Sequence, residues 1–277
     1  MCKIAGVSVS GYYYFLNNKE KKNDKDYEDY LLIKTIFDKK KGKIGARIIK
    51  MDLEDIDVVM NLKKIRRIMI KYDLVCNIRK VNKSRVSLKK NKENVAVKNL
   101  LNRRFKQYTP HKFLSTDISY LKHGGSFSFL SVVKDLASGE ILVWELSKTM
   151  DLDLVLRTAI KLEMYFKARI LSLQDVLLHS DQGFQYTNVI YHNRLKELSI
   201  VQSMSRRGNS VDNAPIESFF GHMKDEIEYS KLNFVELKDL IDGYMIEYNY
   251  KRKQWGRQRM SPVLYRNYLL ELRCKSV

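Results

Sequence analysis

Three β-forming runs in close succession limit the fold of this chain more than any other feature of its sequence. They are FLSTDISYL at residues 113–121, FSFLSVVKDLA at 127–137 and ILVWEL at 141–146. Each run is rich in β-branched and aromatic residues, and short glycine-containing segments separate them. This spacing predicts three sequential strands in an antiparallel meander.

Helical and strand patterns alternate after the meander. The sequence predicts a helix over 152–167, a buried strand over 176–181, a helix that Thr187 caps and that runs to about 198, a strand over 200–205, and helices over 213–228 and 234–249. The order is therefore three strands, a helix, a strand, a helix, a strand and a helix. This is the order of the α/β ribonuclease-H-like fold, a mixed sheet with helices on both faces.

The charge of the chain indicates a polyanionic partner. The formal net charge is +19, and residues 1–110 carry 28 Lys and Arg against 12 Asp and Glu, whereas residues 111–277 carry 23 against 20. No apolar run is long enough to span a membrane, and the N-terminus does not resemble a signal peptide. We therefore expect a cytoplasmic, nucleoid-associated protein. The scattered cysteines argue against a zinc finger, so a metal would need oxygen ligands.

The basic N-terminal part predicts a helix-turn-helix-like region. Helical patterns cover 26–39 and resume at 45–50, an acidic loop is expected over 51–57, and Asn61 can cap the next helix. That helix carries an apolar stripe and five cations, Lys63, Lys64, Arg66, Arg67 and Lys71. This pattern fits either a DNA-recognition helix or a surface helix with a solvated basic face. The helix carries no acids that could pair with the five cations, which favours the DNA-recognition helix.

Four regions follow from these patterns. They are a helical DNA-binding region over 1–78, a basic linker over 79–110, a catalytic core over 111–250 and a basic C-terminal extension over 251–277. Eleven basic residues and one acid occur between Arg79 and Lys106. The linker either lies on DNA or is a solvated tether.

Three carboxylates occupy positions that such a sheet would bring together. Asp117 lies in the first strand, on the face opposite its most apolar positions, and Asp181 lies at the exit of a buried strand. Glu217 lies in the first turns of a helix that Asp212 or Asn213 can cap. Each acid alone is typical of a surface or capping residue, whereas the combination indicates a functional site.

The motifs around these acids resemble a known family. FLSTDISY surrounds Asp117, LLHSDQGFQYTN surrounds Asp181, and SMSRRGNSVDNAPIESFFGHMKDE surrounds Glu217. With YNYKRKQWGRQRMSPVLY near the end, they resemble the DDE transposases and retroviral integrases, and among these the second-frame (OrfB) product of bacterial insertion-sequence family three. The resemblance covers nearly the whole chain.

The resemblance implies a DDE polynucleotidyl transferase that performs transposition. Asp117, Asp181 and Glu217 would bind two Mg²⁺ ions, for which Mn²⁺ can substitute, and would support DNA cleavage and strand transfer. The implied partners are the terminal inverted repeats of the element, target DNA, further copies in a synaptic oligomer, and an upstream-frame helix-turn-helix protein, present as a frameshift fusion. No membrane partner is implied.

Further residues are expected to contact DNA. In the retroviral relatives a lysine placed like Lys224, two helical turns after Glu217, contacts the DNA end. The other candidates are Arg206, Arg207 and Asn213 before that helix, and Lys251, Arg252 and Trp255 after the core. Gly183 is expected to adopt a positive φ, and His179 to hydrogen-bond the backbone rather than act as a ligand or base.

Two alternatives remain open at this point. One is a ribonuclease-H-like nuclease without strand transfer, and the other is a catalytically inert DNA-binding regulator derived from a transposase. The presence of all three acids argues against the inert regulator.

Overall fold

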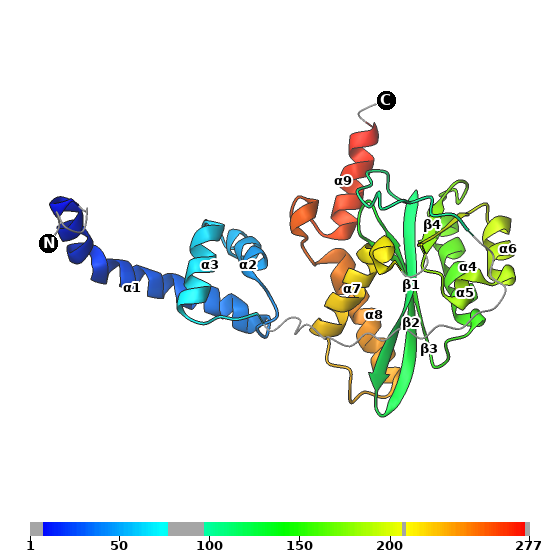
Figure 1. The fold of residues 1–277 in the computed structure, drawn as a ribbon, viewed down its shortest axis with the longest axis horizontal. Helices are drawn as coiled ribbons and strands as arrows, with labels where there is room; N and C mark the ends of the chain where they lie inside the picture. Colours follow the sequence, from blue (N-terminus) through cyan, green and yellow to red (C-terminus); the bar gives the residue numbers. More distant parts are fainter. Residues whose placement is uncertain (1–7, 77–96, 207–208, 275–277) are drawn as a thin grey trace. The chain divides into compact units, whose positions relative to one another are not determined.

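A computed structural model describes residues 8–76, 97–206 and 209–274. The chain divides into two compact units, Met1–Lys83 and Ser84–Val277, and each is described by itself (Figure 1). None of the helices in these described ranges combines the length and the apolar character that crossing a bilayer requires.

The N-terminal unit contains three helices, α1 (Val9–Lys39), α2 (Ala46–Glu54) and α3 (Leu62–Lys71). Its core includes Ile33, Ile49 and Ile65, one residue from each helix. The side chain of Asn61 accepts a hydrogen bond from the amide of Lys63 at 2.8 Å, so the predicted N-cap of α3 is confirmed.

The prediction of an acidic loop over 51–57 is wrong for the first half of that segment. Helix α2 continues to Glu54, because Met51 and Leu53 are buried and their burial stabilises another helical turn. Asp52 and Glu54 lie in the helix and are half-buried, and a polar pattern alone does not distinguish such a helix end from a loop.

Acids on α1 neutralise part of the positive charge of α3. Asp26 is buried and accepts hydrogen bonds from Arg67 at 2.6 Å and from Lys71 at 3.1 Å. Asp29 forms an ion pair with Lys64. The hydrogen bonds from Arg67, more than any other contact, hold the pKa of Asp26 far below its usual value. The expectation that the cations of α3 lack acidic partners is therefore wrong for three of the five.

The C-terminal unit contains a five-stranded sheet with the order β3-β2-β1-β4-β5. Strands β1 (Phe113–His123), β2 (Ser126–Asp135) and β3 (Ile141–Ser147) form the predicted antiparallel meander. Strands β4 (Leu177–Ser180) and β5 (Val201–Met204) extend the sheet in parallel with β1.

Helices cover both faces of the sheet (Figure 1). One face packs against α4 (Leu152–Ala168), α5 (Phe184–Thr187) and α6 (Val189–Glu197), and the other against α7 (Ala214–Glu226) and α8 (Phe234–Tyr250). The predicted cap at Thr187 is wrong by one residue. Thr187 ends the short α5, and Asn188 caps α6 by accepting a hydrogen bond from the amide of Ile190.

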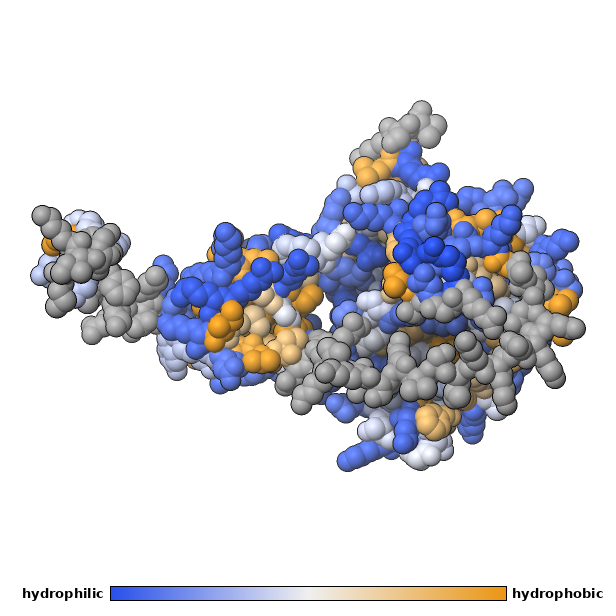
Figure 2. Space-filling model, in the orientation of Figure 1, coloured by the Kyte–Doolittle hydropathy of each residue, from blue (hydrophilic) through white to orange (hydrophobic). Residues whose placement is uncertain are grey.

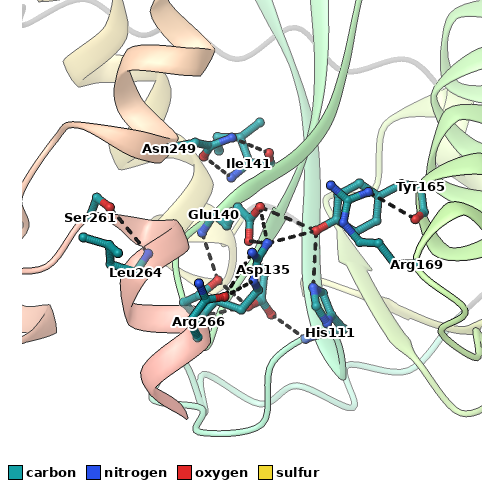
Figure 3. Close-up of polar contacts among 12 residues, drawn as sticks. His111, Asp135, Glu140, Ile141, Tyr165, Arg169, Asn249, Ser261, Leu264 and Arg266 are labelled. Atoms are coloured by element: carbon teal, nitrogen blue, oxygen red, sulfur yellow. Dashed lines mark hydrogen bonds and ion pairs between the residues drawn. The ribbon is translucent and has the colours of Figure 1, made fainter. Parts of the chain in front are cut away.

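The last helix, α9 (Pro262–Cys274), is attached to the core by a buried ion pair. Arg266 on α9 donates to both carboxylate oxygens of Glu140, at 2.8 and 2.7 Å, in the turn between β2 and β3 (Figure 3). Tyr165 of α4 lies within 3.5 Å of the same two side chains. Part of the predicted C-terminal extension is thus packed on the core.

Hydrophilic side chains cover much of the visible surface (Figure 2).

We predict that Asp26→Asn lowers the free energy of unfolding of the N-terminal unit by roughly 1–3 kcal/mol at pH 7, because it weakens three charge-assisted hydrogen bonds. The native state depresses the pKa of Asp26, so this contribution is present above the ordinary carboxyl pKa and is lost as the pH falls below about 4. Hydrogen exchange of amides in α1 and α3 measures the effect. The exposed Asp38→Asn on the same helix is the control, and equal exchange in both variants would contradict the assignment.

Candidate active site

The register of the sheet places Asp117 and Asp181 level with each other. Strand β1 pairs in parallel with β4, and Ser115 lies opposite His179. Two residues further along each chain are Asp117 and Asp181, the latter directly after the last residue of β4. Because neighbouring strands lie about 4.8 Å apart, this register brings the two aspartates together.

Helix α7 brings Glu217 to the same face of β1. Asp117 lies opposite Val132 on β2, and Val132 is buried in the core that contains Ile216 and Phe219 of α7. Residues directly opposite each other in an antiparallel pair share a face, so Asp117 points towards the α7 side of the sheet. Glu217 lies in the first turn of that helix.

Electrostatic interactions confirm that these groups are close together. Burial, more than any other factor, raises the pKa of Asp117 to about 8. The charges of Asp181 and Glu217 contribute to this rise, whereas the amide of Ile118 and the charge of Lys224 oppose it. The structure therefore gathers the three predicted acids and Lys224 around Asp117. Asp117 is the member whose ionisation the protein disfavours most clearly.

Asp181 is held by the loop that follows it. The amide of Gly183 donates to its carboxylate at 2.9 Å and opposes the rise in pKa that burial causes. The expectation of a positive φ at Gly183 is wrong, since its φ is −60°. Glycine is needed for space, because a Cβ there would lie 3.0 Å from the carboxylate of Asp181.

The donor set of this site suits a hard divalent cation. Carboxylate oxygens are the ligands that Mg²⁺ and Mn²⁺ prefer, and three carboxylates lie near one another here. Across the described ranges, no group of three or more His, Cys, Asp or Glu side chains is arranged to hold an ion as it stands. The acids thus share one neighbourhood without forming a closed ligand cage.

Comparisons with known proteins identify the family of the chain. The integrase core domain family matches residues 107–210, a second integrase core domain family matches 198–262, and a helix-turn-helix-like domain family matches 24–81. The putative transposase InsK of insertion sequence IS150 from Escherichia coli K12 is 33% identical over 96% of this chain and 92% of its own length. The chain belongs to the insertion-sequence transposases of family three.

Other relatives of this transposase are more distant. The transposase of insertion sequence IS904 from Lactococcus lactis is 29% identical over 85% of this chain and 92% of its own length. A simian T-cell lymphotropic virus intasome has a chain with a TM-score of 0.47 and 13% identity, which aligns over 64% of this chain and 60% of that chain. The catalytic domain of Mos1 mariner transposase has a TM-score of 0.43 and 13% identity, and it aligns over 58% of this chain and 77% of that chain.

A buried lysine that the sequence analysis missed supports the helix of Glu217. Lys134 on β2 is 7% exposed, and its ammonium group donates to the carbonyl oxygen of Pro215, in the first turn of α7, at 3.1 Å. It also lies 5.6 Å from the ring centroid of Phe219. The sequence did offer a signal for this role, since Lys134 stands in the apolar run FSFLSVVKD and a buried lysine needs a specific partner.

The predicted helix caps before Glu217 are wrong. The N-cap residue Asn213 makes no side-chain capping bond, and Asp212 instead binds Arg206 and Arg103 through its carboxylate. Asn213 is buried, and its amide atoms have no hydrogen-bond partner within the described ranges. Arg207 lies outside the described residues. The predicted DNA contacts of this loop stay predictions.

His179 has a structural environment. It is buried, and its Nδ1 lies 2.9 Å from the hydroxyl oxygen of Ser203 on β5. Burial lowers the pKa of His179 to about 4, so the ring is neutral at pH 7. One partner is thus a side chain, and a backbone hydrogen bond with Asp212 opposes the fall in the pKa.

The other predicted DNA contacts differ in how they are held. Lys63 and Arg66 on α3 are exposed and form no ion pair with another described residue, in contrast to Lys64 and Arg67. After α8, Lys251 is exposed, whereas Arg252 forms an ion pair with Glu226. The guanidinium of Arg259 stacks 5.0 Å from the ring of Trp255. None of these observations tests DNA binding.

We predict that Asp117→Asn stabilises the metal-free transposase at neutral pH, by at least about 1.4 kcal/mol, the equivalent of one pKa unit. The native state raises the pKa of Asp117 to about 8, so its ionisation opposes folding increasingly between about pH 4 and pH 8. Urea unfolding in the presence of a chelator measures the difference. It should grow over that pH range and then level off.

The exposed Asp239→Asn on α8 removes the same charge at a position away from the acids and is the matched control. Equal effects of the two substitutions, or a loss of stability in Asp117→Asn, would contradict the electrostatic account.

Proposed function

We propose that this transposase is a metal-dependent polynucleotidyl transferase that cuts DNA at the ends of its own element and joins those ends to target DNA. The observation that carries the proposal is that the charges of Asp181, Glu217 and Lys224 all lie close enough to Asp117 to shift its pKa. The family assignment supports the same reaction class.

Asp117, Asp181 and Glu217 would hold two Mg²⁺ ions, or Mn²⁺ in their place. When bound, such ions lower the pKa of an attacking oxygen and stabilise negative charge on the phosphate and the leaving oxygen. The raised pKa of Asp117 fits this use, because a cation would favour the carboxylate form that the neighbouring acids disfavour.

Groups of the chain itself orient these acids. The amide of Gly183 fixes the carboxylate of Asp181, and Lys134 fixes the first turn of α7 through the carbonyl of Pro215. Lys224 lies two helical turns after Glu217 and adds a positive charge on the side of the acids. It would attract the phosphate of a DNA end and hold the end near the carboxylates.

The partners follow from this chemistry. Helix α3 would dock on duplex DNA at the terminal inverted repeats through Lys63 and Arg66, whose charges α1 does not neutralise. Two element ends and a target would be held together by several copies in a synaptic oligomer. An upstream-frame helix-turn-helix protein, fused by frameshifting, would add end recognition.

We predict that Asp117→Asn, Asp181→Asn and Glu217→Gln each reduce Mg²⁺-dependent DNA cleavage and joining to background. DNA affinity should remain within about threefold of wild type, because phosphate contacts by cations set it and each substitution removes one negative charge. Gel assays of cleavage and anisotropy measurements of binding test this. Asp239→Asn is the control, and wild-type cleavage by any of the three variants would refute the assignment.

We also predict that Lys63→Ala combined with Arg66→Ala weakens duplex DNA binding and lowers the slope of log affinity against log salt by about two. Lys39→Ala combined with Lys40→Ala removes the same charge from exposed positions at the end of α1 and should leave the slope nearly unchanged. A salt titration of the full chain measures both. Equal slopes for the two double variants would argue against α3 as the DNA-contacting helix.

A further inference from the structure

The end of the predicted basic linker is a fixed part of the catalytic unit. Residues 97–105, here called the upstream segment, run beside β5 and precede the matched integrase core at 107–210. The hydroxyl oxygen of Ser203 accepts hydrogen bonds from the amides of Leu100 and Leu101, at 2.9 and 3.2 Å. Leu101 is 1% exposed. These contacts are not those of a solvated tether.

The upstream segment meets the active-site loop at one buried carboxylate. Asp212 is fully buried and accepts hydrogen bonds from Asn99 Nδ2 at 3.0 Å and Arg103 Nε at 2.6 Å. Arg206, from the other side, donates to it from its backbone amide at 3.0 Å and from its guanidinium at 2.9 Å. Removing a partner from such a group leaves a buried charge poorly compensated.

Asp212 lies in the turn that leads directly into the helix of Glu217. It lies in the 3-10 turn η1 (Ser210–Asn213), which continues directly into α7, and Glu217 lies in the first turn of α7. No side-chain cap holds this end of the helix. The position of the first turn therefore depends on the contacts of Asp212 on one side and on the bond from Lys134 to Pro215 on the other.

We propose that Arg103 and Asp212 are positioning residues for catalysis: Arg103 holds Asp212, and Asp212 fixes the first turn of α7 so that Glu217 faces Asp117 and Asp181. The proposal rests on the proposed function of those three acids. It extends the active site to a residue upstream of the matched integrase core. A different role for Arg103, as a simple contact to the DNA backbone, is an outcome of the test.

Arg104 provides a matched control for Arg103. It is the next residue, it is also exposed, and its guanidinium donates to the carbonyl oxygens of Leu100 and Leu101 and forms no ion pair with a described residue. Arg103→Ala and Arg104→Ala therefore remove the same charge from the same segment. Only Arg103→Ala removes a contact to Asp212.

We expect Arg103→Ala in the full chain to lower kcat for cleavage and the affinity for Mn²⁺ by about 10- to 100-fold, the range for residues that orient metal ligands. KM for DNA should change no more than in Arg104→Ala. Arg103→Lys, which keeps one charged donor, should recover part of the loss. Mn²⁺ binding is measured by electron paramagnetic resonance without DNA, at a temperature where all variants are folded.

Hydrogen exchange of amides 212–220 supplies a readout that does not need activity. Exchange should be faster in Arg103→Ala and in Asp212→Asn than in Arg104→Ala. If neither the wild-type chain nor its fusion with the upstream-frame protein is active, the proposed function is refuted, and hydrogen exchange still decides whether Arg103 positions the helix. Equal exchange and equal Mn²⁺ affinity in Arg103→Ala and Arg104→Ala would overturn the proposal. If, in addition, KM for DNA rose equally in both variants, Arg103 would be assigned to contacts with the DNA backbone.

Discussion

The burial of Asp117 beside two further carboxylates is the constraint on which the rest of the catalytic unit depends. Burial, together with the charges of Asp181 and Glu217, raises the pKa of Asp117 to about 8, so the native state is destabilised locally. The fold maintains this arrangement with contacts outside the acids. The β1–β4 register sets the two aspartates level, and the bond from Lys134 to Pro215 and the contacts of Asp212 hold the helix of Glu217 in place.

The N-terminal unit uses its positive charge for two purposes. Arg67 and Lys71 bind the buried Asp26 and thereby attach α3 to α1, so these cations stabilise the fold. Lys63 and Arg66 are exposed and form no ion pair with another described residue. A count of charges along α3 cannot separate the two groups, since the acids that pair with three of its five cations lie on α1.

The sequence predicted the order of strands and helices along the catalytic unit well, because alternation and strand ends are local patterns. The predicted β1, β2 and β3 agree with the structure to within two residues at each end. Contacts between distant residues could not be predicted in this way. Arg103 and Asp212 are 109 positions apart, so the sequence suggested only a cap for Asp212 and only a linker for the segment of Arg103.

Joining of a pre-cut element end is the most direct test of the central claim, that these acids serve strand transfer rather than hydrolysis alone. A duplex with a recessed, labelled 3′-hydroxyl end is incubated with the full chain, target DNA and Mg²⁺ or Mn²⁺, with the upstream-frame protein fused in front in a parallel reaction. The account predicts a labelled strand covalently joined to target DNA. Metal-dependent hydrolysis without any joined product in either reaction would contradict it and support a nuclease.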